Sequence, residues 1–281
     1  MARERVSEDI YVFTSELYAQ VTAGVIVTEE GTVVVDTLPF PSETAEIVDF
    51  VEDHTPNQAQ FVINTHSHAD HIFGDFLFPN ADIIAHRLCR RAITKYAEKG
   101  LSAAQEQNPE LSSVVIRFPN IVFESELTLR LGSKTIQLVY MPGHTADSIA
   151  VLVKEDRVLF AGDIMMPVPY IVWGDVDQMM QSLQIIRDMN LENIVQGHGE
   201  VLLRGEINET IDSSMDYLKN ITRCVRDALR EDTPLQELLA LDIEQFGKSR
   251  IPLNGLVQQL HQGNLRRLYE RMSASDTTKA N

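Results

Sequence analysis

The apolar residues of this chain form short continuous runs over most of its length and take helical spacing toward its end. Runs at residues 24–27 and 32–35 flank a glycine-containing turn, which predicts a β-hairpin. Because these runs lack alternating polar positions, they are typical of strands covered on both faces. A helical pattern that ends at Thr55-Pro56 and a strand at residues 61–64 come next. This order of strand, helix and strand predicts a partly parallel sheet covered by helices.

A second group of apolar runs predicts another sheet. These runs lie at residues 121–123, 127–131, 135–140, 149–153 and 157–161, with turn signals between them. Residues 99–117, which precede the runs, lack a clear period and are interpreted as a long loop or as short helices. Such a segment forms either a lid over a functional site or a plain surface excursion.

The last part of the chain has the spacing of helices. Apolar residues step by threes and fours from residue 207 to residue 229, which predicts an amphipathic helix of about six turns. Shorter helices are predicted at residues 234–241 and 256–269, and the polar residues 273–281 are expected to fray. The apolar stripe of the long helix either packs on the preceding sheets or forms a homodimer surface.

Two sheets that are each followed by helices predict an α/β fold. The packing solution is a four-layer sandwich of helix, sheet, sheet and helix, with a helical C-terminal extension. We expect residues 1–204 to form the main domain and residues 205–281 to form the extension, packed on it. A chain of 281 residues, 44% of them hydrophobic, is long enough to bury a large core.

Charge and composition exclude several classes of protein. A net charge of -17 opposes binding to the phosphates of nucleic acids. Residues 1–9 lack the apolar core of a signal peptide, and no apolar run approaches the length of a membrane span. Cys89 and Cys224 have no Cys-x-x-Cys neighbour, so we expect free thiols. These features predict a cytoplasmic protein with no nucleic-acid or membrane partner.

The densest cluster of possible metal ligands in the chain follows the strand at residues 61–63. The segment 65–71 reads Thr-His-Ser-His-Ala-Asp-His, so it carries three of the 8 histidines and a carboxylate. Because side chains alternate along an extended strand, His66 and His68 can face the same ion. Asp70 and His71 lie one turn further on and can face a second ion. Zinc binds both imidazole and carboxylate, so this segment predicts a metal site.

Three more residues stand just past short apolar strands, each with a glycine beside it. They are His144, Asp163 and His198. In open α/β sheets this position, beyond the ends of the strands, is where functional residues gather. His86 also follows a strand, but we expect a structural role for it because the other residues already make a full set of ligands.

Strand, glycine and ligand, repeated along the chain, make a pattern that resembles the metallo-β-lactamase fold superfamily, and in particular the dinuclear, glyoxalase II-like members with a bridging aspartate. The resemblance runs from about residue 25 to about residue 199. It implies a first metal ion held by His66, His68 and His144, a second held by Asp70, His71 and His198, and Asp163 as the bridge. It also implies that Asp36, at the end of the strand at residues 33–35, orients the ligands.

This resemblance implies a metal-dependent hydrolase of small molecules. Two zinc ions would share a bridging hydroxide that attacks a carbonyl ester, a thioester or a lactone, and Asp70 would also orient that hydroxide. The apolar segment 165–173 either lines the substrate pocket, with Tyr170 and Trp173 as contacts, or covers the core. The β-lactamases themselves usually carry cysteine where Asp163 stands, which argues against lactam cleavage.

An oxidoreductase is the alternative. Proteins that resemble persulfide dioxygenases hold a single iron ion with two histidines and an aspartate, and the ligand pattern alone does not separate them from the hydrolases. Their Arg-Thr motif before the aspartate is missing here, which favours the hydrolase.

Overall fold

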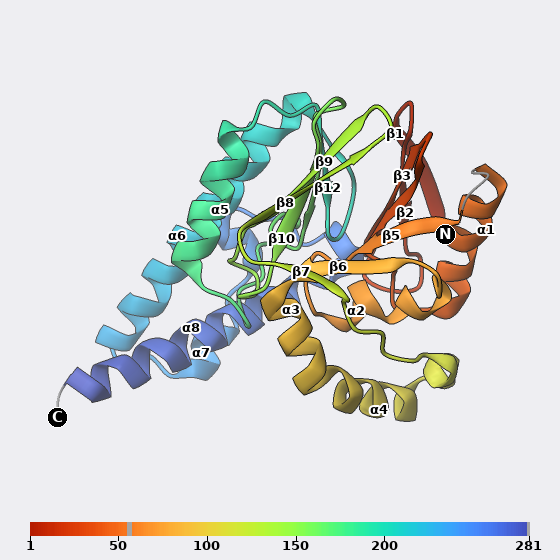
Figure 1. Cartoon of the computed structure of the whole chain (residues 1–281). Helices are drawn as coiled ribbons and strands as arrows, with labels where there is room; N and C mark the ends of the chain where they lie inside the picture. The colour runs from red at the N-terminus through yellow and green to blue at the C-terminus, as the bar shows by residue number, and fades with distance from the viewer. Residues whose placement is uncertain (55–57, 280–281) are drawn as a thin grey trace.

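The computed structural model describes residues 1–54 and 58–279, and it contains two sheets packed face to face (Figure 1). The Thr55-Pro56 pair, which was predicted to end a helix, lies outside the described residues. The first sheet has seven strands in sequence order: β1 Ala2–Ser7, β2 Ile10–Thr14, β3 Thr22–Thr28, β4 Gly31–Val35, β5 Ala59–Ile63, β6 Asp82–His86 and β7 Ile121–Phe123.

Strands β4 to β7 pair in parallel, whereas β1 to β4 are antiparallel. The predicted hairpin and the partly parallel sheet are therefore confirmed. One strand was assigned to the wrong sheet: residues 121–123 pair with β6, through Ile84 and Ile121, and not with the second sheet. An apolar run of three residues indicates a strand but carries no information on its partner.

The second sheet has six strands in the order β13-β12-β11-β10-β9-β8, of which only β11 and β12 are paired in parallel. Its strands are β8 Glu126–Leu131, β9 Lys134–Tyr140, β10 Ile149–Val153, β11 Val158–Gly162, β12 Asn193–Gln196 and β13 Leu202–Leu203. Alternate residues of each sheet point into the space between them. Val33 and Val35 of β4 meet Ile149 and Val151 of β10 in this inner core.

The outer faces of both sheets are covered by helices, which confirms the four-layer sandwich (Figure 1). Helix α1 packs Ile47 and Phe50 on the first sheet, and α5 and α6 pack on the second. The helices are α1 Pro41–His54, α2 Ala69–Ile72, η1 Phe73–Leu77, α3 Arg87–Ala92, η2 Ile93–Ala97, α4 Glu98–Gln107, η3 Pro109–Ser113, α5 Val176–Asp188, α6 Arg204–Arg230, α7 Leu235–Leu239, η4 Ile243–Phe246, η5 Pro252–Gly255 and α8 Val257–Lys279.

Of the two alternatives for residues 99–117, a long loop or short helices, the structure shows short helices. Residues 99–117 contain most of α4 and all of η3, whose Leu101 and Leu111 pack with Cys89 and Ile93 in a small core of their own. The tail that was predicted to fray from residue 273 instead continues α8 as helix to Lys279.

The C-terminal helices share one apolar cluster with the outer face of the second sheet. In this cluster Ile211 and Leu218 of α6 pack with Leu183 of α5 and Ile194 of β12. The predicted boundary at residue 204 coincides with the start of α6 and stays a prediction. Within the described residues, no helix is both long enough and apolar enough to cross a membrane.

Candidate metal centre

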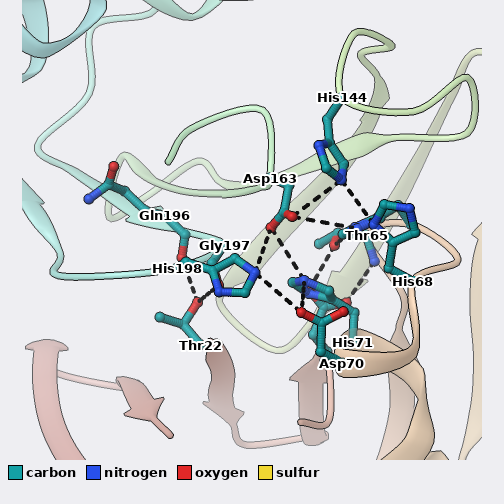
Figure 2. A network of polar contacts seen from close by, with 12 residues as sticks. Thr22, Thr65, His68, Asp70, His71, His144, Asp163, Gln196, Gly197 and His198 are labelled. Atoms are coloured by element: carbon teal, nitrogen blue, oxygen red, sulfur yellow. Dashed lines mark hydrogen bonds and ion pairs between the residues drawn. The ribbon is translucent and has the colours of Figure 1, made fainter. Parts of the chain in front are cut away.

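The strand ends bring all seven predicted ligands together. Figure 2 labels all of them except His66. They come from the chain just beyond β5, β9, β11 and β12. The side chains form two adjacent groups, in each of which the ligand atoms lie within 4.8 Å of one another. One group is His66, His68, His144 and Asp163, and the other is Asp70, His71 and His198.

Asp163 belongs to the first group and also faces the second, so that one of its oxygens points to the histidines of each group (Figure 2). Its Oδ2 is 3.2 Å from Nε2 of His144 and 3.8 Å from Nε2 of His66. Its Oδ1 is 3.3 Å from Nε2 of His71 and 3.5 Å from Nε2 of His198. This is the placement that a bridging carboxylate requires.

Three of the imidazoles are held through their other nitrogen. The Nδ1 of His71 donates to Asp36 at 2.8 Å, that of His144 to the Tyr170 carbonyl at 2.7 Å, and that of His198 to the Ala19 carbonyl at 2.9 Å. With Nδ1 acting as the donor, Nε2 is free to turn its lone pair toward the centre. The orientation of these rings is therefore fixed from outside the two groups.

Asp36 directly follows β4 and lies beside His71, and its role in orienting a metal ligand stays a prediction. Its carboxylate accepts from the backbone N–H of Thr65 at 2.8 Å and from the Thr65 hydroxyl at 2.7 Å, as well as from His71. The residue is buried and has φ of +56°, in the left-handed region that non-glycine residues seldom adopt. Such strain is characteristic of functional sites whose surroundings hold one conformation.

The buried polar atoms fit a cation. Nε2 of His66, Nε2 of His71 and Oδ1 of Asp163 are buried without a hydrogen-bond partner among the described residues. A buried polar atom without a partner is costly, and groups of this kind point to an ion. Imidazole nitrogen and carboxylate oxygen are the donors that zinc and similar divalent ions take.

The protonation of the first group suits metal binding. Burial, together with the neighbouring His71 and His68, holds the pKa of His66 well below its usual range. Burial also lowers the pKa of His144 to about 4, so both rings are neutral at neutral pH. Burial would raise the pKa of Asp163, but the facing histidines outweigh it and keep the carboxylate ionised.

The second group must release protons from both of its histidines when it binds a metal ion. Although burial lowers the pKa of His71, the neighbouring carboxylates, Asp36 foremost, hold it well above its usual range. Although burial lowers the pKa of His198, the facing Asp163 and Asp70 raise it to about 10. A protonated imidazole is no ligand, so metal binding here competes with protons.

A match to a family model identifies the class of protein. The model for the metallo-beta-lactamase superfamily matches residues 18–198, the stretch that contains both groups. The chain belongs to the metallo-beta-lactamase superfamily, whose members are largely metal-dependent hydrolases.

Individual relatives are distant. The chain is 26% identical over 189 residues to "Beta-lactamase-like protein 2 homolog" of Caenorhabditis elegans, covering 67% of this chain and 57% of that protein. It is 25% identical over 172 residues to "Atrochrysone carboxyl ACP thioesterase" of Aspergillus fumigatus, covering 60% of this chain and 48% of that protein. The chain thus spans about half the length of these curated relatives.

Solved structures confirm the fold. A metallo-beta-lactamase from Pontibacter korlensis superposes with a TM-score of 0.63 at 17% identity, covering 78% of this chain and 99% of that one. The sec-alkylsulfatase Pisa1 from Pseudomonas sp. superposes with a TM-score of 0.75 at 15% identity, covering 96% of this chain and 50% of that one. The second match extends over the C-terminal helices as well.

The sequence missed a loop that borders the site, residues 15–21 between β2 and β3. Buried Glu43 of α1 accepts hydrogen bonds from the Ser15 hydroxyl at 2.5 Å and from the backbone N–H of Glu16 at 2.8 Å. Tyr18, in the same loop, is 45% exposed, and the negative charge of Asp70, followed by burial, raises its pKa to about 12. The phenol therefore stays protonated at neutral pH.

The two predicted pocket residues differ in how far their side chains are exposed to solvent. The ring of Tyr170 is half-buried, with its centroid 6.0 Å from that of His144, whereas Trp173 is 68% exposed. Their contact with substrate stays a prediction. His86 joins neither ligand group: its Nε2 donates to the Glu124 carbonyl at 2.8 Å, and its ring stacks on Tyr140.

Proposed function

We propose that this protein is a hydrolase that holds two zinc ions and cleaves a carbonyl ester, a thioester or a lactone. The observation that carries the proposal is the pair of adjacent ligand groups, with Asp163 facing the histidines of both. In this proposal His66, His68 and His144 hold one ion, Asp70, His71 and His198 hold the other, and Asp163 bridges both.

When bound, two divalent ions supply a hydroxide nucleophile by lowering the pKa of water from 15.7 to about 7, and polarise the bond under attack. The chain itself fixes the geometry. Asp36 and the carbonyls of Tyr170 and Ala19 orient three of the imidazoles. Asp70, besides holding an ion, would accept a hydrogen bond from the attacking water and so orient it. Tyr18 keeps its proton and can donate a hydrogen bond to a substrate oxygen.

The surroundings of the centre and the relatives support the proposed substrate class. One relative is named a thioesterase, which supports a thioester among the candidates. Half-buried Tyr170 and exposed Trp173 offer aromatic surface to a small apolar acyl group. We propose a small-molecule substrate, because a net charge of -17 disfavours nucleic acid. A cytoplasmic location stays part of the proposal.

Turnover of a substrate panel tests this proposal. The zinc-loaded chain is assayed against thioesters, lactones and aryl esters, before and after the metal is removed with a chelator. Hydrolysis that disappears with the metal and returns with added zinc supports the proposal. Hydrolysis that survives complete metal removal overturns the mechanism, and persulfide-dependent oxygen uptake by an iron-containing chain would favour the oxidoreductase instead.

A further inference from the structure

We propose that the C-terminal helical region is a brace for the metal centre, in which Asn264 of α8 and the backbone of Leu253 act as positioning groups for His144 and His198. The proposal rests on the metal-binding role given to these histidines above. It assigns to the last part of the chain a function beyond covering the second sheet.

The first contact runs through Asn264, a completely buried residue of α8. Its Nδ2 donates to the Pro169 carbonyl at 2.7 Å, and its Oδ1 accepts from the Ile171 N–H at 2.9 Å. One amide side chain therefore forms hydrogen bonds to the backbone on both sides of Tyr170. The carbonyl of Tyr170 is the acceptor for Nδ1 of His144, at 2.7 Å.

Asn264 is itself held in place by a buried polar network. Its Nδ2 also donates to the Tyr217 hydroxyl at 3.1 Å, and that hydroxyl lies 2.9 Å from Nδ1 of His261. All three side chains are completely buried. Because burial lowers the pKa of His261 to about 4, its ring is neutral and Nδ1 can accept from the hydroxyl. Such a network fixes the amide of Asn264 in one orientation.

Helix α8 also touches the Tyr170 ring directly. A Cβ placed on Gly263 would lie 3.3 Å from Cε2 of Tyr170 and 3.3 Å from Cγ2 of Val172. The lack of a side chain at Gly263 lets the helix approach this closely. The segment that carries the acceptor for His144 is thus packed against α8 and hydrogen-bonded to it.

The second contact reaches the other ligand group. The backbone N–H of Leu253 donates to Oε1 of Gln20 at 3.2 Å. The neighbouring Ala19 carbonyl accepts from Nδ1 of His198 at 2.9 Å, and the Gln20 carbonyl accepts from the Gly199 N–H at 2.9 Å. Ala19 and Gln20 have φ of +44° and +51°. Residues in this conformation need surrounding contacts to hold them.

Each ligand group therefore contains one histidine whose orientation depends on the C-terminal region. The two contacts are separate, because Asn264 acts on the His144 segment and Leu253 acts on the His198 segment. Loss of a partner that orients a metal-binding imidazole commonly weakens metal affinity by about 10- to 100-fold. The brace predicts that N264L weakens the site of His144 and that Q20A weakens the site of His198.

Stepwise zinc affinity of the full chain, measured by competition with a chromophoric chelator, tests the brace. H144A and H198A serve as references that identify the step to which each group belongs. We expect N264L and Q20A each to weaken its own step about 10-fold, and to change the visible spectrum of the cobalt-loaded chain. N264D, which keeps the acceptor but loses the donor, is expected to fall between N264L and wild type, and it carries the test if N264L does not fold.

I221A provides the matched control, because Ile221 is a fully buried residue of α6 in the same apolar cluster. We expect it to lower the melting temperature while the zinc affinity and the cobalt spectrum stay as in wild type. Wild-type affinity and spectrum in N264D and Q20A would overturn the brace, as would an equal loss of affinity in I221A. A wild-type chain that binds neither metal would overturn the proposed function as well.

Discussion

At the scale of single residues, the centre is defined as much by what holds each imidazole as by the imidazoles themselves. Asp36 is the clearest case, since one buried carboxylate accepts from both His71 and Thr65. The dense segment 65–71 predicted a metal site from the sequence alone, whereas the full set of ligands and the orienting role of Asp36 came from the family resemblance and stay predictions. The acceptors on Ala19 and Tyr170 were not predictable, because any residue can supply a backbone carbonyl.

The substitution Asp36→Asn tests the part played by this carboxylate. An amide cannot hold His71 in the same tautomer and accept both bonds from Thr65, so we expect zinc affinity to fall about 10- to 100-fold. Equilibrium competition with a chelator measures this change. Asp53→Asn, on the exposed face of α1, is the control and should bind zinc as wild type does. An affinity of Asp36→Asn within twofold of wild type would refute the role.

Lys248 is a buried lysine whose one described hydrogen bond goes to Oγ of Ser214, at 3.1 Å. Burial lowers its pKa from 10.5 to about 8. Between pH 8 and 10.5 the unfolded chain keeps this proton more than the folded chain does, so the contribution of Lys248 to stability rises with pH in that window. At pH 7 the buried charge costs about 3 kcal/mol.

Lys248→Met removes this charge and should therefore raise the free energy of unfolding at pH 7 by about 1–3 kcal/mol, with a smaller gain at pH 10. Urea denaturation at the two pH values measures the difference. Lys219→Met, at an exposed position of α6, should change stability little at either pH. A destabilised Lys248→Met at pH 7 would show that the hydrogen bond to Ser214 outweighs the cost of burial.

At the scale of elements, the apolar runs predicted most strands because a strand covered on both faces has few polar positions. The strands at the edges of the two sheets were harder to predict. β1 reads Ala-Arg-Glu-Arg-Val-Ser and is mostly exposed, and β13 has only two residues, so neither shows an apolar pattern. The loop at residues 15–21 was missed since its left-handed residues are Ala19 and Gln20, and no glycine marks the turn.

The close approach of the two sheets can be tested at Gly24 of β3. A Cβ on this residue would lie 2.1 Å from Cε1 of Phe160 in β11. Gly24→Ala should therefore lower the free energy of unfolding by about 1–3 kcal/mol through overpacking. Gly100→Ala, in α4 with open space around it, should instead add about 0.5–1 kcal/mol. Chemical denaturation compares the two, and equal effects would contradict the packing described here.

At the scale of the whole molecule, the C-terminal helices and the second sheet share one apolar cluster. The sequence predicted this helical extension from its spacing, yet spacing alone could not separate packing on the sandwich from a dimer surface. Nor could it show that Asn264 reaches Ile171, 93 residues earlier in the chain. Contacts between distant segments follow from the fold and leave no local pattern.

A shared core predicts cooperative unfolding. We expect the full chain to unfold in a single calorimetric transition, and a fragment that ends at residue 203 to lack a cooperative transition, because removing α6 exposes the apolar face of the second sheet. Circular dichroism of the fragment complements the calorimetry. Two separate transitions, or a fragment that melts cooperatively, would show that the extension is an independent domain.

The metal content of the protein tests the central claim most directly. Elemental analysis of the full chain, purified without added metal and again after saturation with zinc, counts the ions that the two ligand groups hold. Two adjacent groups joined by Asp163 predict close to two zinc ions per chain, with the count reduced in Asp163→Asn. About one iron ion per chain, or no bound metal after saturation, would contradict a two-ion hydrolase.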